Sequence, residues 1–215
     1  MSQHRWRLDG QLALITGASA GIGLAISREL LGFGADVMLV ARDADALEVV
    51  RDELAEEFPD RELHAMAADV SSDEDRREIL DWVEDQSDGL NILVNNAGGN
   101  LTKATVDYTE EEWRGIFETN LFSAFELSRY AQPLLTRHAA SCIVNVGSVS
   151  GITSVRSGSP YGMTKAALQQ LTRNLAVEWA EDGVRVNAVA PWYIRTRRTS
   201  GKLADADYYE EVIAC

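Results

Sequence analysis

The chain has 215 residues, of which 46% are hydrophobic, and its 34 acidic and 20 basic side chains give a formal net charge of −14. This length and composition predict one globular domain with a substantial core. The negative charge argues against nucleic acid as a partner, because phosphate-backbone binders need a basic surface, and the lack of a bilayer-length apolar run argues against a membrane.

Short apolar runs alternate with amphipathic segments along the whole chain. The runs predict strands at Leu12–Ile15, Val37–Ala41, Leu63–Ala67, Ile92–Val94, Ile143–Val146 and Val184–Val189. Between them, apolar residues at intervals of three and four predict helices at Leu24–Phe33, Ala44–Phe58, Asp73–Gln86, Glu110–Arg137 and Tyr161–Glu181. This alternation predicts an α/β fold with a doubly wound parallel sheet, in a single domain over residues 1–215.

The N-terminal segment and the two cysteines indicate a reducing compartment. Residues 1–8 lack the apolar centre of a secretory signal. Cys142 lies in an apolar run and Cys215 is the last residue of the sequence, so they offer neither a disulfide framework nor metal-ligand spacing. We therefore expect a cytoplasmic protein without a metal site.

A glycine-rich loop follows the first predicted strand and leads into the first helix. Its sequence is Thr16-Gly17-Ala18-Ser19-Ala20-Gly21-Ile22-Gly23. In a parallel sheet, backbone N–H groups and a helix N-terminus at this place can bind a pyrophosphate. The G-x-x-x-G-x-G spacing differs from the G-x-G-x-x-G fingerprint, and a tight turn without a ligand is the alternative. The position favours a nucleotide, bound through Gly17, Ser19, Gly21, Ile22 and Gly23.

The end of the second predicted strand is where such domains distinguish the two forms of adenosine ribose. An acidic residue there favours a 2′-OH and an arginine favours a 2′-phosphate. Arg42 stands nearest the strand end, whereas Asp43 is placed to cap the next helix. We expect NADP as the cofactor, with NAD as the alternative if Asp43 turns toward the ribose. Asp69 and Val70 would lie near the adenine, unless Asp69 caps the helix that follows.

Tyr161 and Lys165 stand four residues apart at the start of a predicted helix, so their side chains project from one face. By itself such a pair is more often found on a solvated surface. The context favours catalysis, because Ser148 follows the fifth strand and a loop rich in Gly and Ser leads from it to Tyr161. These residues belong to the carboxyl edge of the sheet, where open α/β folds bind ligands.

Taken together, these motifs resemble the short-chain dehydrogenase/reductase family, of the single-domain Rossmann type, over nearly the whole chain. The glycine loop is similar to the cofactor loop of the family, and Asn95-Asn96-Ala97-Gly98 to its motif after the fourth strand. Asn120, Ser148 and Tyr161-x-x-x-Lys165 match its catalytic residues. The run from Pro191 to Thr196 looks most like tropinone reductase-like members, which include carbonyl reductases.

The resemblance implies an oxidoreductase that transfers a hydride between NADP(H) and a small carbonyl compound or secondary alcohol. Tyr161 would be the acid in reduction, and the charge of Lys165 would favour its ionised form while Lys165 also holds the nicotinamide ribose. Ser148 would donate to the carbonyl oxygen. Asn120 would position a water for proton relay, or would instead be a satisfied polar side chain that kinks a helix. The remaining implied cofactor residues are Asn95, Asn96, Ala97, Gly98, Pro191, Ile194 and Thr196.

Two features depart from the family pattern. Trp192 replaces the usual glycine, and it either forms a wall of the substrate pocket or packs on the cleft rim. After the lid region, residues 192–210, the family continues with a helix and an edge strand, so we expect a sheet without these elements and an exposed, apolar sixth strand. A catalytically silent nucleotide-binding or assembly subunit is therefore the alternative function.

The sequence does not select a particular ketone or oligomer. Arg156, Arg197 and Arg198 could meet a carboxylate or the cofactor phosphates, although exposed surface charges are the commoner case. The resemblance implies a homodimer or homotetramer formed through the helices Glu110–Arg137 and Tyr161–Glu181. A nucleotide-sugar epimerase shares the Tyr–Lys chemistry but needs a large second domain, for which the sequence has no room.

Overall fold

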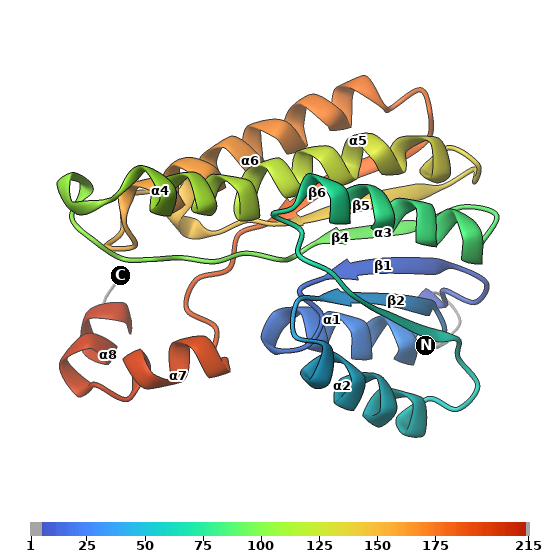
Figure 1. Cartoon of the computed structure of the whole chain (residues 1–215), viewed down its shortest axis with the longest axis horizontal. Coiled ribbons are helices and arrows are strands. Elements are labelled where there is room, and N and C mark those ends of the chain that lie inside the picture. The colour runs from blue at the N-terminus through green and yellow to red at the C-terminus, as the bar shows by residue number, and fades with distance from the viewer. Residues whose placement is uncertain (1–5, 214–215) are drawn as a thin grey trace.

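A parallel sheet of six strands forms the centre of the structure, a computed structural model that describes residues 6–213 (Figure 1). The strands are β1 (Leu12–Thr16), β2 (Asp36–Ala41), β3 (Leu63–Ala67), β4 (Ile92–Asn95), β5 (Ser141–Val146) and β6 (Val184–Val189). Their order in the sheet is β3-β2-β1-β4-β5-β6. The predicted doubly wound parallel sheet is therefore confirmed.

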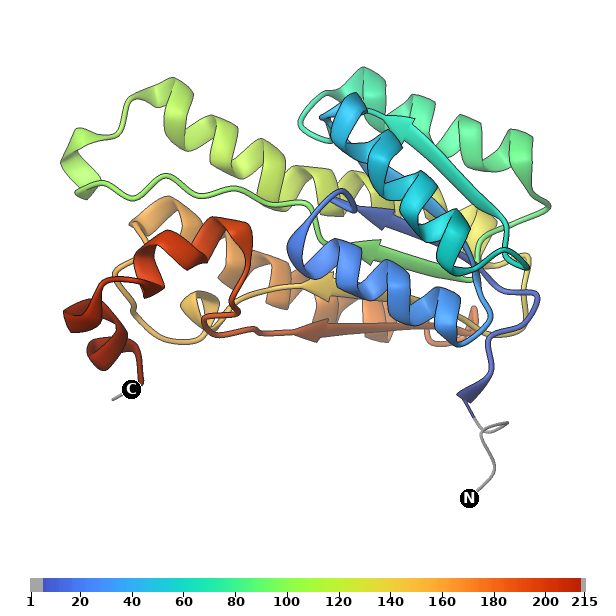
Figure 2. The same ribbon diagram turned by 90° about the horizontal axis from the view of Figure 1, so that it is seen from below.

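Helices cover the two faces of the sheet, as Figures 1 and 2 show. One face packs against α1 (Gly21–Gly32) and α2 (Ala44–Glu57), and the other against α3 (Asp73–Gln86), α5 (Ser123–Leu135) and α6 (Ser159–Glu178). Successive residues of a strand point to opposite faces. In β1, Leu14 accordingly joins the core beneath α3 and α5, whereas Ala13 and Ile15 join the core beneath α1 and α2.

The predicted helix Glu110–Arg137 is interrupted in the structure. It consists of α4 (Glu110–Phe117), a π-helix (Glu118–Phe122) and α5. A capping box begins α4, in which the Thr109 hydroxyl accepts from the Glu112 N–H and the Glu112 carboxylate accepts from the Thr109 N–H. The π-helix turns Asn120 inward, where its side chain is buried. Extra residues of this kind in a helix are frequent at functional sites.

The last strand forms one edge of the sheet among the described residues, since β6 pairs only with β5. This agrees with the predicted edge. Its exposed side chains include Arg185, Asn187 and Val189, so polar residues share that side with one large apolar residue. The prediction that the exposed side of the sixth strand is apolar was therefore only partly correct.

The chain leaves β6 through an extended segment and ends in two short helices, α7 (Arg197–Leu203) and α8 (Ala206–Ile213). In Figure 1 they lie at the end of the molecule toward which the strand arrows point. No helix among residues 6–213 combines the length and the apolar composition needed to cross a membrane.

Candidate active site

Two adjoining pockets open at the carboxyl ends of the strands. The first has a volume of about 520 Å³ and lies between the glycine loop and the start of α6. The second, of about 1000 Å³, lies between the end of β2 and α4. Gly17, Ala97 and Gly98 line both pockets, which therefore meet between β1 and β4. The sheet order reverses direction between these two strands, which is where open α/β folds bind ligands.

Most of the predicted site residues line one of the two pockets. Besides the shared residues, the first pocket is lined by Gly21, Ile22, Asn96, Ser148, Tyr161, Lys165, Pro191, Ile194 and Thr196. The second is lined by Ser19, Arg42, Asp69 and Val70. Gly23 and Asn120 line neither pocket because both are buried behind the walls.

The glycine loop leaves no space for side chains at two of its glycines. Gly17 has a φ of +66°, and a Cβ there would lie 2.9 Å from Nδ2 of Asn96. A Cβ on Gly23 would lie 2.2 Å from the carbonyl oxygen of Gly17. The Asn96 amide donates to the carbonyls of Thr16 and Gly17 at 2.8 and 3.1 Å, which fixes this packing. These two hydrogen bonds and the close packing at Gly17 and Gly23 connect the loop after β1 to the loop after β4.

The first turn of α1 faces the first pocket without a side-chain cap. Ala20, its N-cap residue, makes no capping hydrogen bond, and Ala20, Gly21 and Ile22 line the pocket. The N–H groups of a first helical turn lack partners within the helix and carry partial positive charge. This compact backbone cradle fits the pyrophosphate of a dinucleotide, because no side-chain cap occupies the start of the helix.

Arg42 extends from the end of β2 along the second pocket. Its side chain is 71% exposed, and its Nη1 lies 3.7 Å from Oδ2 of Asp69. The neighbouring Asp43 accepts a hydrogen bond from the Ala46 N–H at 3.1 Å and so caps α2, as predicted. Arg42 and Asp43 both line the second pocket, and the capping bond engages the Asp43 carboxylate.

Asp69 and Val70 form a wall of the second pocket. Asp69 does not cap α3, because Ser72 does so by accepting from the Asp75 N–H. Its carboxylate instead accepts from the N–H and the hydroxyl of Ser71, at 2.9 and 2.8 Å. The alternative reading of Asp69 as the helix cap is therefore wrong, and Asp69 shapes a turn beside the pocket.

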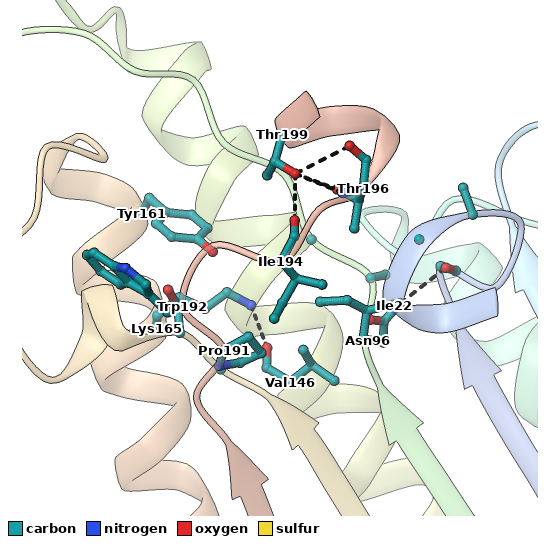
Figure 3. A pocket seen from close by; sticks show the side chains of 17 residues that line it. Ile22, Asn96, Val146, Tyr161, Lys165, Pro191, Trp192, Ile194, Thr196 and Thr199 are labelled. Carbon is teal, nitrogen blue, oxygen red and sulfur yellow. Dashed lines mark hydrogen bonds between the residues drawn. The ribbon is translucent and has the colours of Figure 1, made fainter. Parts of the chain in front are cut away.

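Tyr161, Lys165 and Ser148 line the same pocket. Figure 3 shows the Tyr161 hydroxyl and the Lys165 amine turned into it. Lys165 is only 4% exposed, and its Nζ donates to the carbonyl of Val146 at 2.8 Å and lies 5.8 Å from the centroid of the Tyr161 ring. The Ser148 hydroxyl accepts from the Ser150 N–H at 3.1 Å, which leaves its own proton able to donate. A phenol, a hydroxyl and an ammonium thus share one site.

Two glycines set the position of α6: one lies in the turn after β5 that packs against the helix, and the other directly precedes the helix. A Cβ on Gly151, in the 3₁₀ turn Val149–Gly151, would lie 2.5 Å from the backbone of Lys165, so only glycine allows this approach. Gly158, with a φ of +87°, precedes α6, and Pro160 stands in its first turn. This local sequence sets where the helix begins and therefore where Tyr161 and Lys165 point.

Asn120 lies behind the pockets and is 1% exposed. Its Oδ1 accepts from the Gly99 N–H at 2.8 Å, and its Nδ2 donates to the Gly99 carbonyl at 2.9 Å. A Cβ on Gly98 would lie 3.2 Å from Oδ1 of Asn120 and 3.5 Å from Nζ of Lys165. Asn120 therefore supports the backbone at Gly98 and Gly99, which lies between Asn120 and Lys165. Asn120 also lies in the π-helix, where a helix kink was the alternative prediction for it.

Asn95 does not line the cofactor cleft, so that prediction was wrong. It is 5% exposed, and its amide donates to Ser128 at 3.1 Å and to Asn145 at 2.9 Å in the core. Asn95 is the last residue of β4, and its side chain points toward α5, whereas Asn96 turns into the glycine loop. Neighbouring residues in extended backbone face opposite sides, which explains the difference.

Trp192 lines the first pocket and also packs at its rim. It lines the first pocket beside Pro191 and Ile194, as Figure 3 shows. Its Nε1 donates to the carbonyl of Val212 in α8 at 3.2 Å, and its ring meets that of Tyr193 edge-on with centroids 5.0 Å apart. The indole therefore joins the pocket wall to the C-terminal helices.

Three arginines were expected as possible ligand contacts, and the structure describes the side chain of one of them, Arg156. Arg156 is exposed and lines neither of the two pockets. Arg197 and Arg198 have side chains outside the described part of the structure, and the same holds for Cys215 as a whole. No role for these residues follows from the geometry.

Several pocket residues lack a recognisable sequence signal. Thr199 lines the first pocket and braces Thr196, whose N–H donates to its hydroxyl at 2.9 Å. Ala20, Val146 and Gly147 line the same pocket. The second pocket has a wall of residues from the loop after β4 and from α4 and the π-helix: Gly99, Asn100, Leu101, Glu111, Glu112, Gly115, Ile116, Glu118 and Thr119.

Within residues 6–213, no group of three or more His, Cys, Asp or Glu side chains is placed to hold a metal ion. Cys142 is a half-buried free thiol, and burial raises its pKa, which opposes formation of a thiolate.

Comparison with known proteins gives matches over almost the whole chain. The sequence model described as short chain dehydrogenase matches residues 11–207. A tropinone reductase homolog of Arabidopsis thaliana is 42% identical over 215 residues, which cover 99% of this chain and 80% of the relative. Senescence-associated protein 13 of the same plant is 43% identical over 211 residues, covering 97% and 77% of the two chains.

Solved structures match the fold as well. The RhlG/NADP active-site complex of Pseudomonas aeruginosa gives a TM-score of 0.91 at 35% identity, covering all of this chain (100%) and 84% of that chain. L-sorbose reductase of Gluconobacter frateurii, in complex with NADPH and L-sorbose, gives a TM-score of 0.89 at 30% identity, covering 96% and 80%.

Proposed function

Because the chain belongs to the short-chain dehydrogenase/reductase family, of the tropinone reductase-like type, and is an NAD(P)-dependent oxidoreductase, we propose that it is an NADPH-dependent carbonyl reductase. Its substrates would be small carbonyl compounds, with secondary alcohols in the reverse direction. The observation that carries the proposal is that Tyr161, Ser148 and Lys165 line one pocket beside the glycine cradle.

The cofactor would occupy both pockets. The cradle of Gly17, Ser19, Gly21, Ile22 and Gly23 would hold its pyrophosphate, and Arg42, Asp69 and Val70 its adenosine end. The nicotinamide end would meet Asn96, Ala97, Gly98, Pro191, Ile194 and Thr196, with its ribose on Tyr161 and Lys165. When bound, the cofactor supplies or accepts the hydride.

The chain's own residues would handle the proton and the substrate oxygen. Ser148 would donate a hydrogen bond to the carbonyl oxygen, and Tyr161 would give its hydroxyl proton to that oxygen during reduction. Lys165, which is 4% exposed and whose Nζ lies 5.8 Å from the centroid of the Tyr161 ring, would hold the nicotinamide ribose beside Tyr161. Asn120 would hold the backbone beside Lys165 and so support the return of the proton from solvent.

Residues 192–210 would act as the lid that covers the substrate. The contact of Trp192 with both the pocket and α8 supports this role. The alternative of a catalytically silent subunit gains no support, because Ser148, Tyr161 and Lys165 line one pocket and Asn120 lies directly behind it.

The proposed activity can be tested with purified chain, NADPH and a panel of cyclic, aliphatic and aromatic ketones. We expect oxidation of NADPH that depends on a ketone and on active chain. Binding of NADPH without turnover of any ketone would favour the silent subunit, and absence of binding would contradict the proposed cofactor site.

Arg42 should determine the preference for NADPH. Replacing Arg42 by alanine removes the cation beside Asp69. The ratio of kcat/KM for NADPH to kcat/KM for NADH should then fall by about 10–100-fold, because one charge-assisted contact to the 2′-phosphate is lost. Steady-state kinetics with both cofactors measures this ratio. Arg51→Ala is the matched control, since Arg51 lies on α2 outside both pockets. An unchanged ratio in Arg42→Ala would remove Arg42 from the cofactor site.

A homodimer or homotetramer and a cytoplasmic location stay predictions. Large apolar side chains are exposed on the π-helix, α5 and α6, namely Phe122, Phe125, Met163 and Val177, which supports an interface on these helices. Sedimentation would give the oligomeric state and cell fractionation the location. A monomer at micromolar concentration would contradict the first.

A further inference from the structure

Arg76 is a buried charged residue that the proposed chemistry does not use. It stands in the first turns of α3 and is 3% exposed. The next residue, Arg77, lies on the same helix but has a side chain that is 60% exposed. Burial of a charged side chain is costly unless it is paired and hydrogen-bonded, so the surroundings of Arg76 must compensate for it.

The Arg76 guanidinium connects three segments. Nη1 donates to the backbone carbonyl of Val70 at 2.8 Å. Nε donates to Oε2 of Glu126, in α5, at 2.6 Å. Nη1 also lies 3.7 Å from Oε2 of Glu118, the first residue of the π-helix. One planar cation thus links the loop after β3 to the interrupted helix.

Two of these partners line the second pocket. Val70 and Glu118 both belong to its walls. The residue before Arg76 reinforces the same loop, since Oδ2 of Asp75 accepts from the Asp69 N–H at 2.7 Å. That hydrogen bond and the Ser72 side chain lower the pKa of Asp75, so its carboxylate stays ionised there. Two residues at the start of α3 therefore hold the loop after β3, Asp75 at the N–H of Asp69 and Arg76 at the carbonyl of Val70.

The other end of the connection reaches the candidate active site. Glu118 is two residues before Asn120, whose amide holds both backbone groups of Gly99, and Gly99 lines the second pocket. Arg76 therefore ties the wall formed by Val70 to the segment that carries Glu118 and Asn120.

We propose that Arg76 is a positioning residue for the adenosine end of the dinucleotide. By fixing the Val70 carbonyl relative to the π-helix, it sets the distance between two walls of the pocket that would take the adenosine. This inference rests on the proposed function, because it needs a dinucleotide in that pocket. It gives Arg76 no contact with the ligand and no part in the chemistry.

Binding measurements by titration calorimetry test this role without turnover. The probes are NADPH, adenosine 2′,5′-bisphosphate for the adenosine end alone, and reduced nicotinamide mononucleotide for the other end alone. In Arg76→Met we expect the Kd of NADPH and of the bisphosphate to rise by about tenfold, as for one lost hydrogen bond to a charged group. The Kd of the mononucleotide should not change. Arg77→Met is the matched control and should bind all three probes as the unchanged chain does.

Equal weakening of the bisphosphate and the mononucleotide in Arg76→Met, or no weakening of either, would overturn the inference. If Arg76→Met shows no cooperative unfolding transition, and therefore is not folded, the same binding measurements are made with Arg76→Lys. A lysine keeps the positive charge, but it lacks the planar guanidinium whose two nitrogens donate to Val70 and Glu126. A raised Kd of the bisphosphate is therefore again expected. Wild-type affinity in Arg76→Lys would overturn the inference. Failure of the unaltered chain to bind NADPH or the bisphosphate would instead overturn the proposed cofactor site itself.

Discussion

Replacing Tyr161 by phenylalanine should lower kcat for ketone reduction by about 10²–10⁴-fold, the usual range for loss of a general acid. The substitution removes only the hydroxyl that points into the pocket with Lys165 and Ser148 (Figure 3). The aromatic ring stays, so the pocket keeps its shape and NADPH should bind with nearly unchanged Kd. Steady-state kinetics and a fluorescence titration of NADPH measure the two effects separately.

Tyr130→Phe provides the matched control for this prediction. Tyr130 lies on α5 outside both pockets, and its hydroxyl accepts from Arg77 at 3.4 Å. The same loss of a phenol oxygen at that position should leave kcat unaltered. If Tyr161→Phe keeps most of its activity, another residue protonates the substrate and the assignment of the acid is wrong.

Replacing Gly23 by alanine should abolish measurable binding of NADPH and also lower the stability of the fold. The added Cβ would lie 2.2 Å from the Gly17 carbonyl and 2.5 Å from Nδ2 of Asn96, so the glycine loop must move. Overpacking of this kind typically costs about 1–3 kcal/mol, and here it displaces the backbone that would hold the pyrophosphate. Thermal unfolding with and without NADPH measures both effects.

Gly32→Ala is the control within the same helix. A Cβ on Gly32 would meet only the ring of Phe58, at 3.9 Å, which is ordinary contact distance. We expect this variant to bind NADPH normally and to be at least as stable, because alanine is the better helix former. Normal NADPH binding by Gly23→Ala would mean that the loop is not the pyrophosphate site.

The sheet could be predicted almost completely from the sequence, because its strands are short apolar runs, and the four inner strands β2, β1, β4 and β5 are largely buried on both faces. β3 and β6 have the predicted boundaries at both ends, and so does α3. Helix α1 begins at Gly21 rather than at Leu24, since periodicity locates apolar residues but not a glycine-rich first turn. A kink at Asn120 was predicted only as an alternative, and the π-helix at Glu118–Phe122 itself was not predicted, because one extra residue per turn barely changes the spacing of apolar residues.

The site could be predicted where it follows strand ends. A doubly wound sheet brings the residues after each strand to one edge, so the positions of the glycine loop, Arg42 and Ser148 after strands predicted that they lie at this edge, and all of them line the two pockets. The wall of the second pocket that comes from α4 is a product of tertiary packing and has no local signal. Arg76 and Arg77 are adjacent in an acidic helix, and only the packing of α3 against α5 shows which of them is buried.

The most direct test of the account is the thermal unfolding of the unaltered chain alone, with NADPH, and with NADH. A ligand at 100 times its Kd adds about 2.7 kcal/mol of stability, which corresponds to about 5–10 °C for a domain of this size. We predict such a rise in the unfolding midpoint with NADPH at a concentration where NADH gives little. A cooperative transition that neither cofactor shifts would contradict the claim that the two pockets form one site for NADPH.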